Sequence, residues 1–302
     1  MSLLPLLLPL MAQVGPASAL PSNANPYASS LPIEIIEKKD AEAAKRARAA
    51  QNVTLPASRN TAGCMSAVEA NPERSAELAQ SALGDAIGRE RVRAGLCLGA
   101  ALSDLGRWDE ARGAFVTARD AADAADHASR ARLGAMAGNA ALAAGQAGQA
   151  LALLGPAATD AKIIGDAELT GSIALDRARA LVAVKQPDEA AAALAEARTA
   201  QPDNAQAWLL SATLSRRQEK LSQAQTQIEK AASLAPQDPE IGLEAGVIAM
   251  LSGNETAARR SWTSVLAAGA GSDAAVTAKQ YLSQLGPDTD KSGATTAKAP
   301  KP

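Results

Sequence analysis

Aromatic side chains, histidine and cysteine are scarce in this sequence. Phe, Trp and Tyr make up 2% of the 302 residues, and there are one histidine, His127, and two cysteines, Cys64 and Cys97. Strands need aromatic and β-branched runs, which are nearly absent, so a sheet is not expected. One histidine excludes most histidine-based catalysis, and two cysteines are too few for a thiolate metal site.

A basic block is also missing. Lys and Arg number 30 against 32 Asp and Glu, which gives a formal net charge of −2. Without a cationic stripe, nucleic-acid binding is not expected. Apolar residues are plentiful at 47%, and with so few aromatics the core must be built from Ala, Leu, Val and Ile. Because Ala carries no helix-propensity penalty, this composition predicts an all-α chain.

The common catalytic and cofactor motifs are absent from the sequence. It contains no GxxxxGK phosphate loop, no GxGxxG, no GxSxG and no HExxH. The sequence therefore predicts no cofactor, no metal site, no catalytic residue and no enzyme activity. His127 lies among charged residues and is expected to be solvated.

Residues 1–19 have the pattern of an export signal. A leucine-rich run over residues 1–14 is followed by Ala17, Ser18 and Ala19, which resembles a secretory signal peptide cut after Ala19. Export would place the protein in the periplasm or outside the cell. The alternative is an uncleaved membrane anchor, although the run is short for a span and contains two prolines.

Residues 20–57 are predicted to be a linker followed by a charged helix over residues 33–51. Glu42 precedes Lys45 and Arg46 by three and four positions, a spacing that stabilises helices. Such a helix either packs loosely with a solvated face or binds a partner or a second copy. Residues 286–302, rich in Pro, Ser, Thr, Lys and Ala, are predicted to be a disordered tail.

One pattern recurs between residues 92 and 272. An alanine is followed by a bulky residue four positions later and preceded by a small residue twelve positions earlier. The recurring alanines are Ala111, Ala150, Ala190, Ala224 and Ala258, and the first two intervals between them are five to six positions longer than the last two. The bulky residues are Phe115, Leu154, Leu194, Ile228 and Trp262, and the small residues are Gly99, Gly138, Ala178, Ala212 and Gly246.

This pattern resembles the tetratricopeptide repeat, a helix–turn–helix unit of about 34 residues, which is the length of the last two intervals. The resemblance implies a right-handed α-solenoid of antiparallel helix pairs over residues 58–285. Five repeats would start at Val92, Ala131, Gly171, Ala205 and Pro239. A degenerate pair over residues 58–89 would precede them, and residues 273–285 would form a capping helix. The extra residues of the first two repeats are expected in longer second helices or turns, near residues 120–129 and 159–166.

The resemblance also implies a function. Stacked helix pairs present a concave surface, so the chain would be a protein–protein scaffold or adaptor in the bacterial envelope, with a protein or peptide partner and no small-molecule cofactor. The positions that line this surface in the family form a mildly basic, hydrogen-bonding strip suited to an acidic peptide. In this sequence they include Arg132, Asn139, Arg179, Gln206 and Arg216. The alternative is an envelope-assembly or secretion accessory that oligomerises through the helix at residues 33–51. The oligomeric state is left open.

Cys64 and Cys97 lie about one repeat apart. Equivalent positions of stacked helices face the same way, so the two cysteines could form a disulfide in an oxidising compartment. Two buried free thiols are the alternative.

Overall fold

A computed structural model describes residues 59–285, with side chains described from Cys64 onward. This part of the chain forms thirteen helices and no strand. The helices are α2 (Arg59–Ala70), α3 (Pro72–Asp85), α4 (Gly88–Asp104), α5 (Trp108–Ala121), α6 (His127–Ala143), α7 (Ala147–Ile163), α8 (Ala167–Ala183), α9 (Pro187–Ala200), α10 (Ala205–Arg217), α11 (Leu221–Leu234), α12 (Pro239–Leu251), α13 (Glu255–Ala268) and α14 (Asp273–Leu285). The proposed signal peptide (residues 1–19), the linker and charged helix (20–57) and the tail (286–302) lie outside the described residues.

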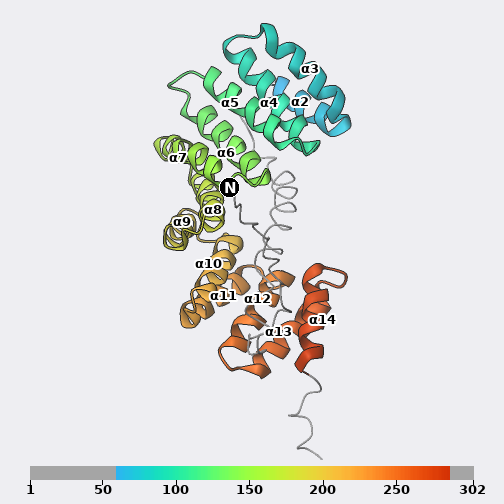
Figure 1. Ribbon diagram of the computed structural model, residues 1–302, viewed down its shortest axis with the longest axis vertical. Coiled ribbons are helices and arrows are strands. Elements are labelled where there is room, and N and C mark those ends of the chain that lie inside the picture. The colour runs from blue at the N-terminus through green and yellow to red at the C-terminus, as the bar shows by residue number, and fades with distance from the viewer. Residues whose placement is uncertain (1–58, 286–302) are drawn as a thin grey trace, which may run out of the picture.

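The helices stack in pairs along a curved path. In Figure 1 the stack runs from α2 and α3 at the top, through α7 and α9 at the left, to α13 and α14 at the bottom. Several first helices of neighbouring pairs contact each other, as α6 contacts α8 and α10 contacts α12. Between residues 59 and 285, the second helices of neighbouring pairs make no comparable contact. The first helices therefore line the inner side of the curve, as expected for an α-solenoid.

The core is built at the three repeated positions. The five recurring alanines are all fully buried, and each bulky residue four positions later is at most 3% exposed. The small residue of the first helix faces that bulky residue. A Cβ added to Gly138 would lie 2.5 Å from Leu154, and one added to Gly246 would overlap the Trp262 ring. The small residue is therefore what lets the two helices of a pair approach.

The turn inside each pair also repeats. The fifteenth residue of each repeat, counted from its predicted start, has a positive φ between 60° and 78° in all five repeats. These residues are Gly106, Gly145, Lys185, Glu219 and Gly253. A left-handed residue commonly ends a helix because it turns the chain out of the helical path. Its recurrence confirms the predicted register of the repeats, including the two in which the residue is not glycine.

The extra residues of the first two repeats are distributed differently from the expectation. Most of them lengthen first helices: α6 and α8 begin one turn before the expected repeat starts, Ala131 and Gly171. Asp126 and Asp166 accept hydrogen bonds from backbone N–H groups there, so each caps the earlier start. The expected lengthening of a second helix holds for α7, which has 17 residues where α5 and α9 have 14.

Candidate functional site

A small hollow opens on the inner side of the curve where α8, α9 and α10 meet. It has a volume of about 40 Å³, enough for one aliphatic side chain. Its walls are Ala178, Arg179 and Val182 of α8, Leu194 of α9, and Leu210, Thr213, Leu214 and Arg217 of α10. Within the described chain, α8 and α10 make no contact comparable to that of α6 with α8 or of α10 with α12.

Two arginines border this hollow, and they differ in their surroundings. Arg217, the last residue of α10, is exposed, and within residues 59–285 no ion pair engages it. The Nη1 of Arg179 donates to Oδ1 of Asp176 at 2.7 Å, and Asn139 of α6 also hydrogen-bonds this carboxylate. Burial raises the pKa of Asp176, while the charge and hydrogen bond of Arg179 and the bond from Asn139 oppose the increase.

The other residues of the predicted strip lie elsewhere on the inner helices. Arg132 of α6 pairs loosely with Asp166, with Nη2 and Oδ2 3.8 Å apart. Gln206 is half-buried at the start of α10. Arg216 is buried, with 4% of its side chain exposed. Its Nε donates to Oε1 of Glu244 in α12 at 2.6 Å, and its Nη2 donates to Oε2 at 3.4 Å.

The structure therefore brings together only part of the predicted strip. Arg179 and Asn139 meet at Asp176, whereas Arg216 fastens α10 to α12 and is covered by protein. The predicted arginines already neutralise carboxylates of their own chain, so they do not form a continuous basic surface. Sequence reasoning missed Leu210, Leu214 and Arg217, although their spacing of four and three residues places them on one helix face.

The sequence suggested that His127 is solvated, but the structure gives it a partner within the protein. His127 is the first residue of α6, its side chain is 33% exposed, and its Nδ1 lies 2.8 Å from Oδ1 of the largely buried Asp160 in α7. The Nε of Arg130 lies 3.6 Å from the other oxygen of Asp160. The imidazole and the guanidinium give polar partners to a carboxylate that would be costly to bury alone, so the cluster joins the helices of one pair.

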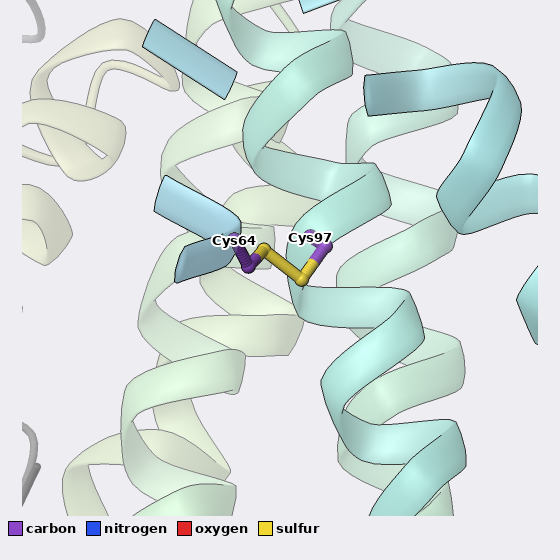
Figure 2. Close-up of a disulfide and its surroundings, with 2 residues drawn as sticks. All are labelled: Cys64 and Cys97. Atoms are coloured by element: carbon purple, nitrogen blue, oxygen red, sulfur yellow. A yellow bond between two sulfur atoms is a disulfide. The ribbon is translucent and has the colours of Figure 1, made fainter. Parts of the chain in front are cut away.

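Cys64 of α2 and Cys97 of α4 face each other across the N-terminal end of the stack. Figure 2 shows the side chains pointing toward one another, with the sulfurs within bonding distance. Their Cα atoms are 6.0 Å apart, inside the range that disulfides require. The arrangement agrees with the pairing predicted from the sequence, and formation of the bond stays a prediction.

Residues 59–285 contain neither a metal-binding cluster nor a membrane-spanning helix. No three or more His, Cys, Asp or Glu side chains gather there in a way that could hold a metal ion. None of the helices in this range combines the length and apolarity that crossing a bilayer requires.

Comparison with known proteins identifies the fold. No family model and no curated protein matches the sequence. Among solved structures, PilF of Pseudomonas aeruginosa is 14% identical with a TM-score of 0.57, covering 74% of this chain and 95% of PilF. BtubC of P. vanneervenii is 15% identical with a TM-score of 0.54, covering 77% of this chain and 94% of its own. MamA of Desulfovibrio magneticus RS-1 is 16% identical with a TM-score of 0.51, covering 62% of this chain and 99% of its own.

PilF and MamA are tetratricopeptide-repeat proteins. At these identities the similarity shows the fold, and the chain therefore has the tetratricopeptide-repeat fold, an all-α solenoid. The prediction made from the repeated alanines is confirmed.

Proposed function

We propose that this chain is a non-enzymatic interaction scaffold that binds a peptide segment of a protein partner on the inner side of its solenoid. The supporting observation is the hollow between α8 and α10, which offers aliphatic walls beside the exposed Arg217. A small apolar pocket beside one accessible cation suits an aliphatic side chain that has a carboxylate close to it in sequence. The packed solenoid would bind such a segment with little rearrangement.

We further propose that the scaffold works in the bacterial cell envelope, after export to the periplasm. Two features support this location. Residues 1–19 have the pattern of a signal peptide. Cys64 and Cys97 are placed to pair, which is useful only where thiols are oxidised.

The test is affinity capture from a bacterial envelope fraction with variants of the hollow. Val182→Glu puts a charge into the apolar wall, and Arg217→Glu reverses the accessible cation. Both positions are at least partly exposed, so the fold should persist. Arg179 and Arg216 are poor choices, because replacing either would strand a buried carboxylate.

Arg260→Glu is the matched control, because Arg260 is an exposed arginine on α13, away from the hollow. We expect the wild type and Arg260→Glu to capture the same partner protein. The captured amount of that protein should be at least tenfold lower with Val182→Glu and with Arg217→Glu. Circular dichroism would verify that all variants stay helical. An identical set of captured proteins for every variant would refute the proposed groove.

A further inference from the structure

The hollow between α8 and α10 selects its occupant by two properties. Val182, Leu194, Leu210 and Leu214 make its walls aliphatic, and its volume limits the occupant to a single aliphatic side chain. The neighbouring exposed cation, Arg217, favours a carboxylate within a residue or two of that side chain.

One segment of this chain outside the described residues has both properties. Residues 31–37 read Leu-Pro-Ile-Glu-Ile-Ile-Glu and alternate large aliphatic residues with carboxylates. Residues 1–30 contain no Asp or Glu, and residues 286–302 contain no Leu, Ile, Val, Met or aromatic residue. Between residues 38 and 58, the carboxylates Asp40 and Glu42 lie far in sequence from Val53 and Leu55.

The segment can reach the hollow. Residues 38–58 connect it to the start of α2. With residues 38–51 in the helix predicted from the sequence, this connection still spans up to about 45 Å, since the helix gives about 20 Å and residues 52–58 add about 25 Å when extended. From α2 the stack advances through α4 and α6 to α8 and α10, and helices that pack at about 8–10 Å put the hollow roughly 30–40 Å away. A tether of this length holds the segment at an effective concentration in the millimolar range, so even weak binding would be populated.

We propose that residues 31–37 occupy the hollow between α8 and α10 when no partner is present. An isoleucine side chain fills the hollow, and Glu34 or Glu37 pairs with Arg217. The inner surface is then blocked by its own chain, and a partner peptide must displace this segment. The inference rests on the proposed function, because it makes the peptide-binding surface self-occupied.

Hydrogen exchange on the full-length chain, followed by mass spectrometry, tests this proposal. In the wild type we expect amides of residues 31–37 to exchange at least tenfold more slowly than those of residues 22–29. Arg217→Glu should remove most of this protection, and Glu34→Lys with Glu37→Lys should do the same. The triple variant that combines both charge reversals should regain it, because the pair is restored with opposite polarity. Arg260→Glu is the control and should leave the protection unchanged.

Three results would overturn the proposal. The first is the absence of protection in residues 31–37, and the second is protection that Arg217→Glu leaves intact. The third is protection that disappears on dilution together with a dimer seen by light scattering, which would show binding to a second copy.

The same proteins separate this inference from the proposed function. If Arg217→Glu abolishes partner capture but residues 31–37 are unprotected, the groove binds partners and is not self-occupied. If residues 31–37 are protected and no variant changes partner capture, the segment occupies the hollow and the proposed function fails. If both hold, Ile33→Asp with Ile36→Asp should increase partner capture severalfold, since the competing segment is lost.

Discussion

At the scale of single residues, the contact between the small residue of the first helix and the bulky residue of the second is the tightest constraint. The sequence pattern predicted that both positions matter, and the structure shows the reason. Gly138 lies against Leu154, and Gly99 lies against the Phe115 ring, with no room for a methyl group at either glycine. Close-packed interiors tolerate an added methyl group poorly when the neighbours cannot move aside.

Gly138→Ala should therefore destabilise the protein by about 1–3 kcal/mol, although alanine is the better helix former. Gly113→Ala is the matched control, because Gly113 lies within α5 and a Cβ there would meet nothing within 4 Å. This second change should stabilise by about 0.5–1 kcal/mol. Urea unfolding of the two variants measures the difference, and equal stability of both would contradict the packing argument.

The polar contacts between helices were much harder to predict than the core. Burial of the five alanines follows from helical periodicity, which the sequence displays directly. The pairing of Arg216 with Glu244 depends on how far α12 is rotated relative to α10, and that rotation is a property of the stack. The pairing of His127 with Asp160 is of the same kind. Arg216 and His127 were therefore assigned to the surface when only their own helix was considered.

At the scale of helices, side-chain caps mark the start of the first helix in four of the five repeats; α4 begins after Ile87, which provides no side-chain cap. The caps of α6, α8, α10 and α12 are Asp126, Asp166, Asn204 and Asp238, and each accepts at least one backbone N–H bond. This signal was present in the sequence, because Asp and Asn are preferred helix caps. The repeat alignment nevertheless placed the starts of α4, α6 and α8 one turn late, since a fixed repeat period leaves no place for an added turn.

The cap of α6 leads to a pH-dependent prediction. Hydrogen bonding from Ser129 lowers the pKa of Asp126. The backbone N–H of Ser129 donates to Oδ1 of Asp126 at 3.0 Å. A carboxyl group whose pKa is lower in the folded state than in the unfolded state stabilises the fold when the pH is above its unfolded-state pKa of about 3.9. This contribution is lost as the pH falls through the folded-state pKa. Asp126→Ala should therefore cost about 1 kcal/mol at pH 7 and almost nothing well below that value.

Urea unfolding at several pH values would measure this effect. Asp120→Ala is the control, because Asp120 is an exposed carboxylate in the last turn of α5 and caps no helix start. It should show no stability loss at pH 7. A loss for Asp126→Ala that persists undiminished at the lowest pH would show that the carboxylate charge is not responsible.

At the scale of the whole molecule, the stability of a solenoid is distributed along the stack. Each helix pair contacts only its neighbours, so a local change should be felt mainly in adjacent pairs. The helix at the N-terminal end of the described chain is thinly packed. α2 packs on α3 and α4, and Val68 is its one fully covered residue among those whose side chains are described. A covalent link from α2 to α4 would compensate for this thin packing.

Loss of that link should act locally. A disulfide between Cys64 and Cys97, separated by 33 positions, would stabilise the folded chain by roughly 3–4 kcal/mol through the entropy of the unfolded state. Reduction, or Cys64→Ser with Cys97→Ser, should speed amide exchange in α2 by at least tenfold and leave α12 to α14 unchanged, because the far helices share no contact with the link. Thiol alkylation with and without reductant must first show that the bond is formed, and alkylation of both cysteines without reductant would reject it. If the bond is present and its loss accelerates exchange equally in all helices, the stack unfolds as one unit and the nearest-neighbour description fails.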